Sequence, residues 1–88
     1  MKEIVFTVGD PLGLHARPAG NLVKLAQSFK SEGTITLERS GKCASVKRLL
    51  AVMGLGVKGG DRITLLVKGE DEEEAVRAIE TWLEENLI

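Results

Sequence analysis

The sequence is poor in aromatic side chains, and this shortage excludes a class of function. Phe and Trp together make up only 3% of its 88 residues, and tyrosine is absent. Proteins that bind single-stranded nucleic acids use aromatic rings as stacking platforms, and most nucleic-acid binders also carry a basic surface. The net charge of this chain is -1. We therefore expect no binding of nucleic acid.

Cysteine and long apolar runs are also scarce. Cys43 is the only cysteine, so no intrachain disulfide can form and folding needs no oxidising compartment. We expect Cys43 to be a small, half-buried strand residue, and a reactive thiol is the alternative. No stretch is long enough to cross a bilayer, and the N-terminus lacks the apolar region of a signal peptide. These features predict a cytoplasmic protein without membrane insertion, folded as a single domain over residues 1–88.

Alternation of apolar and polar residues predicts four strands. They cover residues 4–8, 34–39, 42–46 and 61–68, and the Ser40-Gly41 turn joins the middle two as a hairpin. Apolar residues that recur at steps of three and four positions instead predict helices. One starts at Ala16, a short one covers 47–53, and the last follows Asp71.

Each long helix has one apolar stripe. The first comprises Ala19, Leu22, Val23, Ala26 and Phe29, and the last comprises Ala75, Val76, Ile79 and Leu83, with Trp82 at its edge. Asp71 and Glu74 match a capping box, and Glu72 to Glu74 suit the positive end of the helix dipole. We interpret this acidic run as helix chemistry, and we expect neither a metal site nor a cofactor.

The order of these elements predicts the fold class. Strand, helix, strand, strand, short helix, strand and helix suit an α+β protein. The expected architecture is an open-faced β-sandwich, a four-stranded antiparallel sheet with three helices on one face (βαββαβα).

The only histidine, His15, stands where a loop becomes a helix. Gly13 allows a sharp turn before it, and Pro18 suits the first helical turn, which places His15 at or beside the N-cap. The unpaired amides and the dipole at this helix end favour an anion and disfavour the imidazolium. Arg17 adds a fork of donors for phosphate oxygens. The combination suits a reversible phosphohistidine, and the alternative is a capping His15 beside a solvated Arg17.

Residues 13–19, GLHARPA, resemble the active-site signature of the HPr family, the histidine-containing phosphocarriers of the phosphoenolpyruvate:sugar phosphotransferase system. Residues 41–42, 47–50 and 52–56 resemble a second block of that family. The resemblance covers essentially all 88 residues.

The resemblance implies a carrier rather than a stand-alone catalyst. Enzyme I, charged by phosphoenolpyruvate, would phosphorylate His15 on Nδ1, and the group would pass to a IIA domain of a sugar permease. Arg17 and the amides of the helix N-terminus, including Ala16, would hold the phosphate. A monomer is the simplest form for a protein that visits two partners in turn.

The resemblance also implies that partners dock on the first and the short helix. The expected interface residues are Gly20, Lys24, Arg48, Leu49, Leu50 and Met53. A two-turn helix cannot bury every side, so at least one or two of its three large apolar residues should be exposed. The alternative is that Leu49, Leu50 and Met53 all belong to the core.

Arg48 departs from the family pattern. Many HPr proteins carry at this place a serine that an ATP-dependent kinase phosphorylates, so the serine-linked switch is in doubt for this chain. Arg48 would instead attract an acidic partner. The nearby Ser45 is expected to be the N-cap of the short helix.

Three other functions fit parts of the sequence. One is an HPr-like regulatory binding module that transfers little phosphate, and another is a carrier of the nitrogen-related phosphotransferase branch. A small enzyme such as an acylphosphatase would need an asparagine in a phosphate-cradling loop, whereas Asn21 lies inside the first predicted helix. The sequence identifies neither the sugar nor the downstream acceptor.

Overall fold

A computed structural model describes residues 1–87 and shows four strands and three helices in these residues. The strands are β1 (Lys2–Thr7), β2 (Glu32–Leu37), β3 (Cys43–Ser45) and β4 (Arg62–Lys68). The helices are α1 (Ala16–Gln27), α2 (Leu49–Met53) and α3 (Glu72–Asn86). The predicted order of elements is therefore confirmed.

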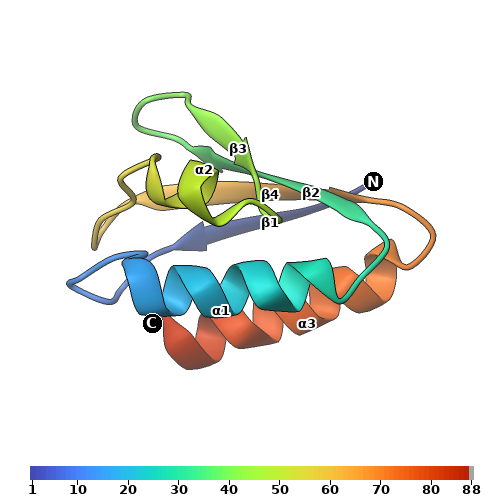
Figure 1. Ribbon diagram of the computed structural model, residues 1–88. Coiled ribbons are helices and arrows are strands. Elements are labelled where there is room, and N and C mark those ends of the chain that lie inside the picture. Colours follow the sequence, from blue (N-terminus) through green and yellow to red (C-terminus); the bar gives the residue numbers. More distant parts are fainter. Residues whose placement is uncertain (88) are drawn as a thin grey trace.

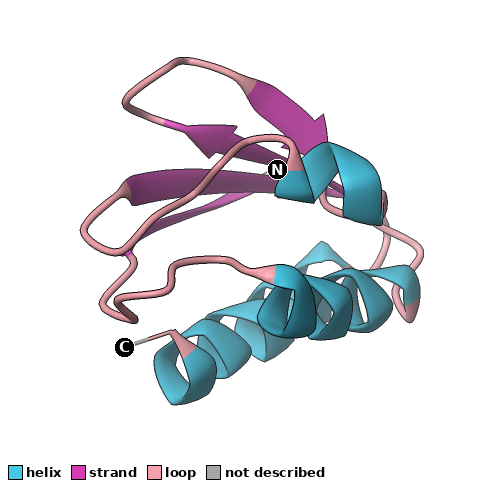
Figure 2. Cartoon of the chain, turned by 60° about the vertical axis from the view of Figure 1, so that its left-hand side comes forward, coloured by secondary structure: helices cyan, strands magenta, loops and turns pink. Residues whose placement is uncertain are grey.

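The strands form one antiparallel sheet in the order β1-β4-β2-β3. In Figure 1, α1 and α3 lie side by side along one face of this sheet, and α2 lies beside β3. Figure 2 shows the other face of the sheet without a helical cover. The open-faced α+β sandwich expected from the sequence is confirmed.

The core lies between the sheet and the helices, as the apolar patterns predict. On β4, Ile63, Leu65 and Val67 are buried, while the residues between them are partly exposed. The buried stripes of the long helices are Ala19, Leu22, Val23 and Ala26 on α1, and Ala75, Ile79 and Leu83 on α3. Val52 of α2 and Leu87 after α3 join the same core.

Cys43 differs from its prediction because it is exposed rather than half-buried. It lies in β3 as expected and pairs with Thr36 of β2. The next residue, Ala44, pairs with buried Ile35, so the alternation of a strand directs Cys43 to the uncovered face.

The predicted capping box at the start of α3 is wrong. Asp71 is the N-cap, but its side chain makes no cap hydrogen bond. Its carboxylate instead accepts hydrogen bonds from the backbone amides of Lys30 and Ser31, each at 2.9 Å, and from the Ser31 hydroxyl. These donors, the Ser31 hydroxyl first, lower the pKa of Asp71 to about 2. Asp71 therefore ties the start of α3 to the α1–β2 connection.

The prediction for Ser45 is also wrong. The N-cap of α2 is Arg48, whose side chain makes no cap hydrogen bond, and Ser45 is the last residue of β3. Its hydroxyl accepts a hydrogen bond from the Lys47 amide at 3.3 Å, and its carbonyl accepts one from the Arg48 amide at 3.1 Å. Ser45 therefore shapes the turn before the helix rather than capping the helix itself.

Candidate functional site

His15 is the N-cap of α1, as predicted, and its imidazole is exposed. Its backbone is extended, with φ -80° and ψ -179°, and its side chain makes no cap hydrogen bond. Its carbonyl accepts a hydrogen bond from the Ala19 amide at 2.9 Å, which closes the first helical turn. The ring is therefore positioned by the helix start without being used to cap it, so the capping role considered for His15 is absent.

The start of α1 leaves two backbone donors next to His15. The first amides of a helix have no intrahelical acceptor, and Pro18 has no N–H at all. Since Ala19 already bonds the His15 carbonyl, the amides of Ala16 and Arg17 are the ones that remain for an anion. Arg17 is exposed and contributes its guanidinium as well.

The loop before His15 packs closely on the α2–β4 loop. The Leu14 amide donates a hydrogen bond to the Val57 carbonyl at 3.1 Å, and the Leu14 side chain is buried. Gly13 has φ +66°, and a Cβ there would overlap the Val57 carbonyl oxygen. A Cβ on Gly59 would lie 2.7 Å from the Asp10 carbonyl oxygen. The two loops can approach this closely because glycine occupies both contact points.

Asp61 holds the α2–β4 loop in shape. Its carboxylate accepts a hydrogen bond from the Lys58 amide at 2.8 Å and pairs with Arg39, whose Nε lies 3.0 Å away. Arg39 also donates to the Gly56 carbonyl at 3.3 Å. The hydrogen bond from Arg39, followed by that from the Lys58 amide, lowers the pKa of Asp61. This network supports the loop on which the His15 loop rests.

The end of α3 supports the His15 loop from another side. The amides of Gly9 and Asp10 donate hydrogen bonds to the Leu87 carbonyl, at 2.7 and 3.2 Å. The Leu87 side chain is fully buried. The residue after α3 is thus bonded to the loop that leads from β1 to His15.

A cavity of about 180 Å³ opens beside His15. It is lined by Asp10, His15, Arg17, Pro18, Asn21 and Asn86. The sequence predicts no role at this site for Asp10, Asn21 or Asn86. No local motif connects Asn86, at the end of α3, with the start of α1. The structure brings together His15 and Arg17, the two residues proposed for phosphate chemistry.

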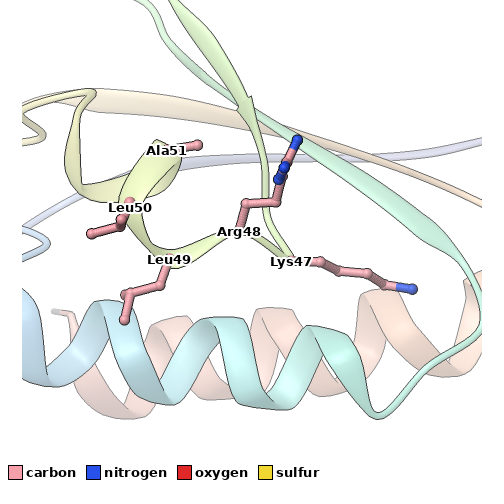
Figure 3. A pocket seen from close by; sticks show the side chains of 5 residues that line it. All are labelled: Lys47, Arg48, Leu49, Leu50 and Ala51. Atoms are coloured by element: carbon pink, nitrogen blue, oxygen red, sulfur yellow. The ribbon is translucent and has the colours of Figure 1, made fainter.

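The three large apolar residues of α2 are exposed. The exposed fractions are 38% for Leu49, 85% for Leu50 and 39% for Met53, whereas Val52 is buried. The prediction that at least one or two of them face solvent is confirmed, and the core alternative is wrong. A second cavity, of about 510 Å³, lies against the segment from Lys47 to Ala51. In Figure 3, Leu49 points toward α1 and Leu50 projects away from Arg48.

The basic residues beside this apolar surface differ in whether their side chains are held by hydrogen bonds and ion pairs. The Lys47 ammonium donates a hydrogen bond to the Phe29 carbonyl at 2.9 Å and lies 3.9 Å from Glu32. Arg48 makes no ion pair within residues 1–87 and is exposed. On α1, Lys24 is exposed and Gly20 is half-buried, and a Cβ on Gly20 would meet open space.

The described residues lack a metal-binding cluster and a membrane-spanning helix. Residues 1–87 contain no group of three or more His, Cys, Asp or Glu side chains arranged to hold a metal ion. No helix in the described part of the chain has the length and apolar character needed to span a membrane.

Fold and site together define a class of protein, the small α+β phosphocarriers with a histidine at a helix N-terminus. Comparison with known proteins identifies the family. A family model described as the PTS HPr component phosphorylation site matches residues 2–85. The chain belongs to this HPr family of the phosphotransferase system.

Individual relatives are similar in sequence to this chain over nearly its full length. The phosphocarrier protein HPr of Lysinibacillus sphaericus is 49% identical over 85 residues, which cover 97% of this chain and 94% of the relative. The phosphocarrier protein HPr of Mycoplasma pneumoniae is 42% identical over 88 residues, 100% of this chain and 99% of the relative.

The fold is also similar to that of solved structures. A crystal structure of HPr from Thermoanaerobacter tengcongensis superimposes with a TM-score of 0.88 at 36% identity, covering 96% of this chain and 92% of that chain. The function of the chain is that of a phosphocarrier in the phosphotransferase system, and the regulatory-module and nitrogen-branch alternatives are not favoured.

Proposed function

We propose that His15 is the residue that carries the phosphoryl group, through Nδ1. Enzyme I, charged by phosphoenolpyruvate, is the donor, and a IIA domain of a sugar permease is the acceptor. The observation that carries this proposal is the exposed imidazole of His15 at the N-cap of α1, free of cap bonds and next to two unpaired amides and Arg17. His15 is also the only histidine in the sequence.

The transfer needs a neutral ring with its proton on Nε2. The Nδ1 lone pair attacks phosphorus, the new N–P bond forms, and the bond from phosphorus to the donor breaks with its electron pair returning to the donor. The amides of Ala16 and Arg17 and the Arg17 guanidinium bind the phosphoryl oxygens during the exchange. Because the helix start fixes the two backbone amides in place before the reaction, they stabilise the transferred charge without reorganisation.

Partners dock around His15 on α1 and α2. The proposed interface comprises Gly20, Lys24, Arg48, Leu49, Leu50 and Met53. The exposed leucines supply apolar contact area, and Lys24 and Arg48 supply positive charge for an acidic partner surface. We further propose that the carrier works in the cytoplasm as a monomeric single domain, because it must dock two partners in turn through one surface.

A three-component assay tests the proposal. Enzyme I, phosphoenolpyruvate and a IIA domain are incubated with or without the chain, and the mass of the IIA domain is followed. The IIA domain should gain one phosphoryl group only when the wild-type chain is present, and His15→Ala should abolish the gain. Transfer that continues with His15→Ala would contradict the assignment.

A further inference from the structure

Asn86, the last residue of α3, lines the cavity beside His15 and Arg17. It comes from the far end of the sequence and belongs neither to the sequence motif at residues 13–19 nor to the docking surface. Asn86 is exposed, and it lines the same cavity as His15, the residue proposed to carry the phosphoryl group.

The backbone and side chain of Asn86 are both fixed. Its Nδ2 donates a hydrogen bond to the Trp82 carbonyl at 2.8 Å, and a carbonyl can only accept, which settles the orientation of the carboxamide. The next residue, Leu87, is buried and accepts hydrogen bonds from the amides of Gly9 and Asp10. Asn86 is thereby held in register with the loop that carries His15.

One N–H of the carboxamide remains. A carboxamide nitrogen has two N–H donors, and Trp82 takes one of them. The cavity also contains the carboxylate of Asp10, which opposes an added negative charge. A fixed neutral donor in the cavity favours a phosphoryl oxygen, because hydrogen bonds to charged acceptors are stronger than those between neutral groups.

We propose that Asn86 is a phosphate-binding residue that donates its second N–H to the phosphoryl group on His15 and stabilises the phosphorylated state. This inference rests on the proposed function of His15. It gives α3 a part in phosphoryl transfer and makes the equilibrium between carrier and donor depend on a residue outside the sequence motif.

A competition experiment measures the effect directly. Wild-type protein labelled with ¹⁵N and unlabelled Asn86→Ala are mixed in equal amounts with catalytic enzyme I and limiting phosphoenolpyruvate. Enzyme I equilibrates the phosphoryl group between them, and intact-protein mass spectrometry resolves both populations. The ratio of phosphorylated to free protein should be about 3- to 10-fold higher for the wild type, and Asn86→Asp should shift it further because of charge repulsion.

Glu84→Ala is the matched control, since Glu84 is exposed on the same helix and does not line the cavity. It should share the phosphoryl group equally with the wild type. A merely structural role of Asn86 would lower the melting temperature of Asn86→Ala and leave the ratio at one. Equal sharing between wild type and Asn86→Ala therefore overturns the inference alone, whereas a wild type that takes no phosphoryl group overturns the proposed function as well.

NMR of the wild type gives a second readout that needs no variant. The side-chain ¹⁵NH₂ signals of Asn86 should shift when His15 is phosphorylated, with the larger change at the proton not bonded to Trp82. Signals that stay in place on phosphorylation would overturn the inference.

Discussion

The carbonyl oxygen of Val57 occupies the space that a Cβ on Gly13 would need. It also accepts the hydrogen bond from the amide that follows Gly13, that of Leu14, at 3.1 Å. The α2–β4 loop thus fixes the backbone immediately before His15. The position of the nucleophile depends on this contact between two loops that are far apart in sequence.

Gly13→Ala should therefore damage both stability and transfer. The positive φ and the overlap with Val57 predict a loss of about 1–3 kcal/mol in the free energy of unfolding, and the displaced loop should slow phosphorylation of His15. Denaturant unfolding and the rate of adduct formation measure the two effects. Gly20→Ala is the control for stability, because its Cβ meets open space on a helix and should stabilise by about 0.5–1 kcal/mol. An unchanged stability of Gly13→Ala would show that the close approach of Gly13 to the Val57 carbonyl does not constrain the loop.

Leu50 and Val52 lie in the same short helix but should respond oppositely to truncation. Leu50→Ala removes an exposed side chain, so stability should change by less than about 0.5 kcal/mol, while the Kd for enzyme I should rise by roughly 5- to 10-fold. Val52→Ala should cost about 1–3 kcal/mol of stability because it leaves a void in the core. Titration calorimetry and thermal unfolding separate the two effects. An unaltered Kd for Leu50→Ala would remove Leu50 from the interface.

Arg48→Glu should slow phosphoryl transfer from enzyme I by about 3- to 10-fold at low salt, because it reverses a free positive charge on the docking surface. Raising the ionic strength should reduce the difference from the wild type. Lys42→Glu makes the same change of charge in the exposed turn between β2 and β3 and should transfer at the normal rate. If both variants, or neither, were slowed, Arg48 would have no specific role in docking.

Asp71 should make the stability of the chain depend on pH in the acidic range. Its folded-state pKa, about 2, lies below its ordinary value of 3.8, so the ionised carboxylate favours the folded state. This contribution is complete above the ordinary pKa and disappears as the pH falls through the folded one. The melting temperatures of the wild type and Asp71→Asn should differ at pH 6 and converge near pH 2. A constant difference across this range would show that the charge of Asp71 contributes nothing.

Much of the fold could be predicted because its signals are local. Alternation marks the strands, as at Ile63, Leu65 and Val67, and one stripe on each long helix marks the buried face. The order of strands in the sheet could not be derived, because β4 pairs with β1 and β2 through contacts across the whole chain. The same limit explains Asp71, whose carboxylate bonds Lys30 and Ser31 in place of its own helix.

In the candidate site, too, some residues are placed by local sequence and others by contacts between distant segments. His15, Arg17 and Pro18 are neighbours in sequence, so the start of a helix places them together by local geometry alone. Asn86 reaches the site through the packing of α3 and through the bonds of Leu87 to the loop after β1. No periodicity or motif near Asn86 indicates that contact.

We propose above all that His15 itself accepts the phosphoryl group. The most direct test is intact-protein mass spectrometry after incubation with phosphoenolpyruvate and a cognate enzyme I, with His15→Ala in parallel. We expect one acid-labile phosphoryl adduct on the wild type and none on the variant. No adduct with a demonstrably active enzyme I, or an adduct that survives in His15→Ala, would contradict it.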